Sequence, residues 1–562
     1  MDNYALADQL TLLSKLMDIH GENAFKTKAY AAAAFALEKL PQQAADLSKE
    51  KISSIKGIGE SAGKKIIELL ETGELKALQQ LLAQTPEGIL EMMNIKGLGA
   101  KKIHTLWKGL GLDSIEALQH ACEQNKIAEQ KGFGEKTQQN ILEAIRYQQE
   151  NRGKYLYAQV EDFAEALQAK LTATFSGHKT ERTGAFRRQL DVIEVLEWLT
   201  TIRHGDLKMF FNAPEFQLVS ESEQALEYLA NNLIKLKFHL TTETDFAIQH
   251  FVTTGNAAFV TACKNSSSWD NIKEAKTEHE VFKKLGLQFI EPPLRETAEI
   301  IIQAQNNTLP NLIQVADIKG LIHAHSNWSD GGYSIEEMAQ ECIRCGFEYL
   351  VLSDHSKAAF YANGLSEARI KEQHQRIDEL NSKLAPFKIF KSIECDILND
   401  GELDYTPDVL QTFDVVIASI HSNLQMTQEK AMKRLLGAIT NPYISILGHM
   451  TGRLLTKRKG YPVDHKEIID TCAKNNVVIE INASPQRLDM DWRWINYALQ
   501  QGVLLSINPD AHSMDNFRYL KYGVLVAQKG GLSKEQNLSS MSLLQLERFV
   551  QAQKQKRALI QS

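Results

Sequence analysis

The sequence predicts a multidomain protein with an α-helical N-terminal region and a C-terminal region of alternating strands and helices. The first reason is length, because 562 residues exceed what one hydrophobic core accommodates. The second is a glycine-containing pattern that occurs three times within the first 150 residues, each time before a helix-forming stretch. The third is a series of short apolar runs after about residue 317, which alternate with helical stretches as in β/α units.

The composition is that of a folded protein and excludes several classes. Apolar residues make up 43% of the chain and charged residues 24%, and no apolar run approaches the ~18 residues of a membrane span. The N-terminus lacks the basic start and apolar stretch of a secretory signal, and six cysteines are too few for a disulfide scaffold. With 63 basic and 70 acidic residues, the net charge is −7, so any DNA-binding surface must be local. We expect a cytoplasmic protein with no membrane partner, and the sequence leaves the oligomeric state open.

The repeated glycine pattern predicts turns that hold phosphate groups. Each copy has a lysine followed by Gly-x-Gly, in which x is apolar. The glycines permit a tight turn, and the helix that follows presents free N–H groups and a positive dipole end. This is the helix-hairpin-helix element, which grips the DNA backbone without reading its sequence. The predicted DNA-binding residues are Lys56, Gly57, Gly59, Lys96, Gly97, Gly99, Lys131, Gly132 and Gly134.

The stretch from Asn23 to Tyr30, the three hairpins and their spacing resemble the N-terminal half of bacterial family X DNA polymerases. Lys65 falls where DNA polymerase beta has its Schiff-base lyase lysine, so a lyase role stays open beside that of a solvated or phosphate-contacting lysine. The resemblance implies an α+β nucleotidyltransferase-like palm after the helical region. The implied segments are a helical DNA-binding domain over 1–85, a fingers-like region over 86–150, a palm and thumb over 151–300 and a linker over 301–316.

The implied palm lacks the carboxylates of the family. Gly184 and Arg187 match the turn that holds the incoming triphosphate. The family has an Asp-x-Asp strand after this turn and a third Asp on a neighbouring strand, which together hold two Mg²⁺ ions. Here Val195 and Glu197 take the Asp-x-Asp positions, and the third position falls near Lys237. A valine cannot ligate Mg²⁺ and one glutamate cannot hold two ions, so we expect a catalytically dead or severely weakened palm, and a Mg²⁺ site there is doubtful.

The C-terminal apolar runs end in residues that ligate metals. In a barrel of parallel strands the C-terminal strand ends converge on one face. Six histidines, one glutamate and two aspartates would therefore meet there. Nine such ligands exceed what one ion takes and suit two or three divalent ions, for which imidazole with carboxylate favours Zn²⁺ or Mn²⁺, and also Fe²⁺. Such clusters are suited to hydrolysing phosphate esters. The candidate ligands are His323, His325, Asp330, His355, Glu394, His421, His449, Asp510 and His512.

The region 317–562 resembles the PHP domain (polymerase and histidinol phosphatase), and the stretch Leu321 to Gly331 is specific for it. The resemblance implies a distorted seven-stranded (β/α)7 barrel with three metal ions. It also implies that all nine candidate residues are ligands, since each matches a ligand position of the family.

A basic loop follows one of the candidate histidines. Arg453 is predicted to hold a non-bridging phosphate oxygen during catalysis, and Lys457 and Arg458 to contact the DNA backbone. Arg487, after another strand end, is a second phosphate-binding candidate.

Three hypotheses follow from these patterns. The leading one is a DNA-binding, metal-dependent phosphoesterase or nuclease for DNA repair, which acts on gapped DNA or damaged 3′ ends as a 3′→5′ exonuclease, 3′-phosphatase or abasic-site enzyme. The second is an active gap-filling DNA polymerase with the barrel as proofreader. The third is a non-catalytic DNA-binding scaffold.

Overall fold

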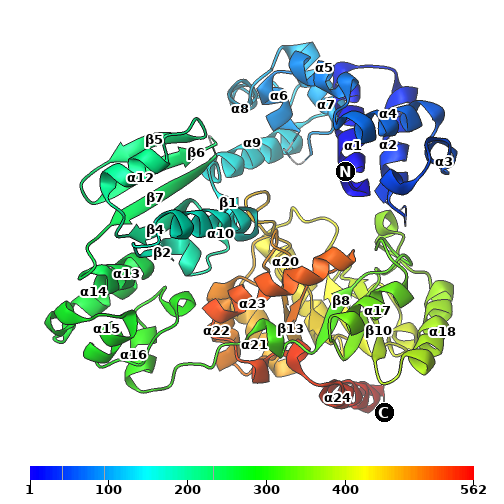
Figure 1. Cartoon of the computed structure of the whole chain (residues 1–562). Helices are drawn as coiled ribbons and strands as arrows, with labels where there is room; N and C mark the ends of the chain where they lie inside the picture. Colours follow the sequence, from blue (N-terminus) through cyan, green and yellow to red (C-terminus); the bar gives the residue numbers. More distant parts are fainter. Residues whose placement is uncertain (39, 41, 94, 96, 232, 562) are drawn as a thin grey trace. The chain divides into compact units, whose positions relative to one another are not determined.

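The computed structural model describes residues 1–38, 40, 42–93, 95, 97–231 and 233–561. They form two compact units, Met1–Arg152 and Gly153–Ser562, which Figure 1 shows coloured along the chain. The finer division into five segments stays a prediction. Among the described residues, no helix combines the length and the apolar character that crossing a membrane requires.

The first unit is helical, as the sequence predicts. Leucine, isoleucine and alanine side chains from all its helices form one buried cluster. In the first two copies of the glycine pattern, the second glycine begins the next helix in extended conformation, while Gly57 and Gly97 adopt positive φ angles of 96° and 93°. The third copy differs, because turns over residues 124–129 precede it instead of a helix. The helices are α1 (Asn3–His20), α2 (Ala24–Glu38), α3 (Lys49–Ser54), α4 (Glu60–Thr72), α5 (Lys76–Gln84), α6 (Glu87–Met92), α7 (Ala100–His104), α8 (Ile115–Glu123) and α9 (Glu135–Glu150).

The second unit begins with a mixed α+β region, as expected. We call residues 153–240 the palm segment and residues 246–305 the thumb segment. The palm segment has a five-stranded sheet in the order β2-β4-β7-β6-β5, whose only parallel pair is β4 with β7. The thumb segment is helical around its own apolar cluster. The palm elements are β1 (Tyr155–Leu156), α10 (Tyr157–Thr174), β2 (Thr180–Thr183), α11 (Gly184–Arg187), β3 (Val192–Ile193), β4 (Val195–Thr200), α12 (His204–Phe210), β5 (Phe216–Glu221), β6 (Ala225–Ala230) and β7 (Ile234–Leu240). The thumb helices are α13 (Phe246–Thr254), α14 (Ala257–Lys264), α15 (Glu278–Lys284) and α16 (Ile300–Gln305).

The rest of the second unit is the predicted distorted (β/α)7 barrel. Seven parallel strands follow one another from β8 to β14, and a bridge between Ala324 and Ala511 brings the two ends of the sheet together. Helices surround these strands (Figure 1). The strands are β8 (Gly320–Ala324), β9 (Tyr349–Leu352), β10 (Lys388–Asp396), β11 (Val415–Ser419), β12 (Ile446–Leu447), β13 (Val478–Asn482) and β14 (Leu505–Asn508). The helices are α17 (Ile335–Arg344), α18 (Glu367–Leu384), α19 (Pro407–Leu410), α20 (Gln428–Thr440), α21 (His465–Asn475), α22 (Ile495–Gln500), α23 (Leu520–Lys529) and α24 (Leu543–Gln561).

Apolar packing determines which part of the barrel is available for chemistry. Strand residues such as Ile322, Val351 and Ile417 pack with Leu546 and Val550 of α24 in one buried cluster. These strand residues precede the polar residues at the strand ends. The barrel therefore has an apolar layer on the α24 side and a polar layer at the carboxyl ends of its strands.

Buried polar contacts join the barrel to the palm and thumb segments. Lys529, at the end of α23, has a fully buried side chain whose Nζ lies 2.6 Å from Glu296 Oε1 and donates to the backbone oxygen of Arg188 at 2.8 Å. In α10, Glu161 accepts a hydrogen bond from the Tyr522 hydroxyl at 3.2 Å. These contacts connect residues more than 200 positions apart, so they depend on the packing of the whole unit.

Candidate metal centre

All nine predicted ligands lie at the carboxyl ends of the barrel strands or in the loop after β8. Every ligand except Asp330 lies within a barrel strand or within four residues after its end, and together they represent six of the seven strands. The side chain of Asp330 comes from the loop that leads to α17. The structure therefore gathers in one place side chains separated by up to 189 positions in the sequence, from His323 to His512.

Glu394 is the centre of this cluster. Its carboxylate oxygens lie 2.9 Å from His449 Nε2, 3.1 Å from both His421 Nε2 and His355 Nδ1, and 3.3 Å from His323 Nε2. The side chain is 1% exposed. A carboxylate that contacts several imidazoles could serve as a ligand in more than one ion site.

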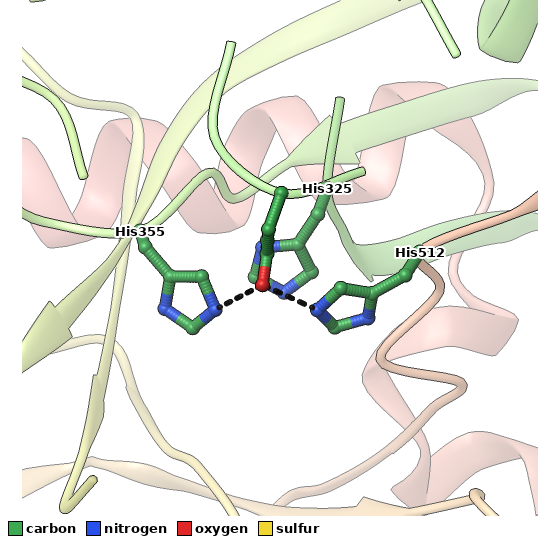
Figure 2. Close-up of side chains that lie close together, drawn as sticks. His325, His355 and His512 are labelled. Carbon is green, nitrogen blue, oxygen red and sulfur yellow. Dashed lines mark ion pairs between the residues drawn. The ribbon is translucent and has the colours of Figure 1, made fainter. Parts of the chain in front are cut away.

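Donor atoms gather in three groups that could each hold an ion, with all atoms of a group within 4.8 Å of one another. Figure 2 shows His325, His355 and His512 together, with dashed lines from one carboxylate oxygen to the rings of His355 and His512. This oxygen is Asp330 Oδ2, 3.6 Å from His355 Nε2 and 3.5 Å from His512 Nε2. Of the two other groups, one shares His325 with the group in Figure 2, and the other shares His355 with it and contains Glu394. They are His323, His325 and Asp510, and His355, Glu394 and His421.

The three acidic candidate ligands are deprotonated, which is the form that binds a cation. Burial alone would raise the pKa of Glu394 and of Asp510, but the neighbouring histidines outweigh burial and hold both pKa values well below their ordinary range. The pKa of Asp330 is lowered in the same way, chiefly by His512. The three carboxylates are therefore anions at neutral pH.

Unpaired nitrogen atoms test whether these residues fit metal ions. His323 Nε2, His325 Nδ1 and His449 Nδ1 are buried and have no hydrogen-bond partner among the described residues. A buried nitrogen without a partner costs free energy unless a ligand satisfies it. Imidazole nitrogens beside carboxylates are the donors of divalent transition-metal sites, so the donor set fits such ions.

The backbone is strained at two of the candidate ligands. His323 has a φ of 66° and Asp510 a φ of 53°, in the left-handed region that non-glycine residues rarely adopt. The pairing of β8 with β9 shifts register at the same place, between Ile322 and Ala324. His323 therefore sits in a bulge, which redirects its side chain. Strain of this kind is typical of functional sites.

Two buried carboxylates behind the histidines were not predicted from the sequence. Glu480 Oε2 lies 2.6 Å from His323 Nδ1, and its other oxygen accepts from the backbone N–H of His449 at 3.1 Å. Asp396 Oδ1 lies 3.0 Å from His421 Nδ1. These contacts place a proton on Nδ1, so that Nε2, which faces Glu394, is the nitrogen that could bind a cation. One signal for Glu480 was present in the sequence, because it is an acidic residue within an apolar strand. In the structure Glu480 is completely buried in β13.

In the structure the side chain of Arg453, which is predicted to hold a phosphate oxygen, contacts partners within the protein, and its role in catalysis stays a prediction. Its guanidinium donates to the backbone oxygens of Arg487 (2.9 Å) and Leu488 and to Asp491 Oδ2 (2.6 Å), and it lies 3.7 Å from Asp191 of the palm segment. These interactions occupy its donors inside the protein. Arg453 thus has a structural role between the barrel and the palm segment, because its long side chain reaches partners that are remote in sequence.

Other cations stand closer to the cluster. Arg487 Nε lies 3.8 Å from Asp510 Oδ2. Burial and the nearby charge of Arg487 lower the pKa of Arg458, whose guanidinium donates to the backbone oxygen of Gly452. Lys457 is exposed. Arg487 therefore provides a positive charge beside the cluster, where it could attract an anion.

In the first unit, the glycine turns lie at the surface. Lys56, Lys131 and Gly132 are exposed, and Lys102 lies over the ring of Phe133, 5.6 Å from its centroid. Lys65 is paired with Glu68 at 2.6 Å. Lys96 lies outside the described residues. The roles of the turn residues in DNA binding remain predictions.

The palm positions also lie where the sequence predicted. In the sheet, Glu197 is opposite Lys237, and Val195 is opposite Lys235. Glu197 Oε2 lies 2.8 Å from His239 Nε2. Lys237 thus occupies the position opposite Glu197 on the neighbouring strand, and its ammonium is paired with the carboxylate of Glu227 at 2.8 Å.

The turn that is predicted to hold a triphosphate contacts the protein itself. Arg187 forms two hydrogen bonds with the carboxylate of Glu278, at 2.9 and 2.8 Å. A Cβ atom at Gly184 would lie 2.0 Å from Glu197 Oε1, so the turn packs directly on that carboxylate. The arginine is therefore already neutralised by an acid of the thumb segment.

Comparison with known proteins agrees with this architecture. A model described as a helix-hairpin-helix domain matches residues 1–75, a SAM-like helix-hairpin-helix tandem matches 89–146, and a PHP domain matches 322–484. The DNA polymerase/3′-5′ exonuclease PolX of Bacillus subtilis (strain 168) is 33% identical over 96% of this chain and 98% of its own length. A "Probable phosphatase" of Thermoanaerobacter sp. (strain X514) is 25% identical over 38% of this chain and 86% of its own. A "Probable phosphatase" of Caldicellulosiruptor bescii is 25% identical over 34% of this chain and 78% of its own.

Proposed function

The chain belongs to the family of the DNA polymerase/3′-5′ exonuclease PolX, and from this we propose that it is a DNA-binding, metal-dependent phosphoesterase that acts on 3′ ends in DNA repair. The observation that carries the proposal is the convergence of nine ligand-type residues at one end of the barrel, with buried imidazole nitrogens that form no hydrogen bond with any described residue. Matches to helix-hairpin-helix models in the first unit support DNA as the partner.

The nine candidate ligands would hold two or three divalent ions. When bound, such ions lower the pKa of a water molecule and stabilise the leaving oxygen of a phosphate ester. The chain's own residues do the rest. Glu480 and Asp396 fix the orientation and tautomer of His323 and His421. Arg487, beside Asp510, offers a guanidinium to a non-bridging phosphate oxygen.

We also propose that the palm segment does not polymerise DNA. Val195 offers no ligand atom, and Glu197 is held by His239 at 2.8 Å. On the neighbouring strand, Lys237 would repel a divalent cation. The palm segment would instead position DNA relative to the barrel, to which it is joined by buried contacts.

The test uses a 5′-labelled primer on a gapped template with Mn²⁺, with and without nucleotides. We expect the primer to shorten in both cases. His323→Ala should abolish shortening and leave DNA affinity largely intact, whereas His465→Ala, a barrel histidine outside the cluster that stacks on Trp494, should shorten the primer normally. Full activity of His323→Ala would refute the assignment of the barrel as the nuclease.

A second candidate is a gap-filling polymerase with a proofreading barrel. It is favoured by the similarity to PolX over almost the whole chain and by the complete five-stranded palm sheet. Nucleotide-dependent extension of the primer by the His323→Ala variant would establish this function and refute the inactive palm.

A further inference from the structure

Two exposed aromatic side chains stand next to the candidate metal centre. Phe360 is 86% exposed and Tyr361 is 63% exposed. They lie in a single 3-10 turn (Phe360–Ala362) of the loop that follows the candidate ligand His355. Large apolar side chains in such exposed positions are informative when they cluster beside a site.

The loop buries its small residues and exposes its large ones. Ala359 and Ala362, on either side of the aromatic pair, are 0% and 2% exposed. Folding by burial of apolar area would favour the opposite arrangement, since a phenylalanine gains far more than an alanine. The exposure of the two rings is therefore a property of the loop geometry, which holds them outward.

Hydrogen bonds fix this geometry. Leu365 N donates to the backbone oxygen of His355 at 2.8 Å, which closes the loop on the ligand from which it starts. Asn363 Nδ2 donates to the backbone oxygen of Trp328 at 3.1 Å. A Cβ atom at Gly364 would lie 1.9 Å from the backbone oxygen of Ser356, so only glycine permits the closure. The aromatic pair is thus held in place before any ligand arrives.

The rings form a continuous path from the cluster to solvent. The ring centroids of Tyr361 and His355 lie 6.4 Å apart, and those of Phe360 and Tyr361 lie 6.1 Å apart at an angle of 78°. Although the side chain as a whole is exposed, partial burial of its hydroxyl raises the pKa of Tyr361, and nearby Asp396, Glu394 and Asp330 raise it further, while Arg487 acts in the opposite direction. The tyrosine therefore borders both the acidic cluster and its neighbouring cation.

We propose that Phe360 and Tyr361 stack on the base of the 3′-terminal nucleotide whose phosphate ester lies at the candidate metal centre. This inference rests on the proposed function and names the residues that recognise its substrate. A nucleotide carries a flat aromatic base close to its own phosphate, so a phosphate bound beside His355 brings its base to the adjacent rings. Aromatic side chains beside a phosphate site are the stacking platforms of single-stranded nucleic acid binding.

The stack makes the barrel discriminate between ends that carry a base and ends that do not. An abasic 3′ end has the same phosphates but no ring to stack. Loss of one base–aromatic contact weakens binding by roughly fivefold to 150-fold. The wild-type protein should therefore bind and cleave a base-bearing end more efficiently than an abasic end of the same length.

A binding experiment tests the stack without catalysis. The probe is an oligothymidylate with 2-aminopurine as its 3′-terminal base and a cleavage-resistant phosphorothioate as its last linkage, mixed with the full-length, metal-loaded protein. Stacking on Phe360 and Tyr361 should quench the fluorescence of the probe. Phe360→Ala and Tyr361→Ala should lose most of the quenching, Tyr361→Phe should keep it, and Leu544→Ala, an exposed apolar residue of α24 that is 57% exposed, should match wild type.

Cleavage of matched oligonucleotides gives the second readout. With Mn²⁺, the ratio of kcat/KM for a base-bearing 3′ end to that for an abasic 3′ end should fall at least fivefold in both alanine variants, mainly through KM, with the abasic end unaffected. Phe360→Leu keeps apolar volume without a flat ring and should behave like Phe360→Ala. Normal quenching and an unchanged ratio in the alanine variants would overturn the proposal. If wild type cleaves neither end, the proposed function fails, and the quenching still decides the stack.

Discussion

The buried contact between Lys529 of the barrel and Glu296 near the end of the thumb segment yields a quantitative prediction. Glu296 Oε1 accepts from Lys529 Nζ at 2.6 Å and from Arg188 Nε at 3.0 Å. The Lys529 side chain is fully buried and that of Glu296 is 8% exposed. One carboxylate thus serves two cations, so the two partners of the salt bridge are not equivalent.

Removing the acid should be costly. The Glu296→Gln variant leaves the ammonium of Lys529 and the guanidinium of Arg188 close together and buried without an anion. Breaking a buried ion pair in this way costs about 3–5 kcal/mol of unfolding free energy.

Removing the lysine should be much less costly. Burial lowers the pKa of Lys529 to about 8, although Glu296 raises it. Relative to 10.5 for the free side chain, this means that the charged form is disfavoured by about 3 kcal/mol in the folded protein. Lys529→Met removes this penalty and retains the apolar stem, but leaves the buried carbonyl of Arg188 without this donor, at a cost of about 1–3 kcal/mol. The two effects nearly cancel, so the net change should be less than about 2 kcal/mol.

Urea unfolding at pH 7, followed by tryptophan fluorescence, measures these changes, because Lys529 Nζ lies 4.6 Å from the ring centroid of Trp492. Lys529→Met added to Glu296→Gln should restore part of the lost stability. The control Lys208→Met removes an exposed lysine paired with Glu221 and should cost less than about 1 kcal/mol. Equal losses in the two single variants, or an additive double variant, would refute the reasoning.

Three other predictions concern the metal centre and the thumb segment. Glu394→Gln should lower the number of bound metal ions per chain by more than one in elemental analysis, because its carboxylate contacts several candidate ligand histidines. An unchanged number of ions would contradict a role for Glu394 as a ligand. Removal of the metal ions by a chelator should lower the thermal unfolding midpoint of wild type, since an ion present at 100 times its Kd adds about 2.7 kcal/mol to the unfolding free energy. The midpoint of Glu394→Gln should fall less, because this variant is expected to bind fewer ions. Burial would raise the pKa of Glu278, but its hydrogen bonds with Arg187 and the charge of Arg295 outweigh burial and lower it. The resulting stabilisation is present above pH 4.5 and lost as the pH falls further, so acid titration should destabilise wild type more than Glu278→Gln, and parallel curves would contradict this.

The candidate metal centre could be predicted because its pattern is local. Each ligand follows or ends an apolar run, and parallel strands bring their ends together whatever the details of packing. His323 shows where this simple argument stops, because the register shift and the φ of 66° at this residue have no signal in the strand pattern. Glu480 was missed for a related reason, since its role depends on a partner 157 positions away.

The sequence alone determined the barrel and the helical hairpins, because strand periodicity and glycine turns are properties of short segments. Only the tertiary structure decided that Arg453 is held inside the protein, that Lys529 joins the barrel to the thumb segment, and that Phe360 points outward beside the cluster. Long charged side chains find partners that are remote in the chain, and burial of an aromatic ring depends on how its loop closes. Both are fixed by packing between segments, which no local pattern records.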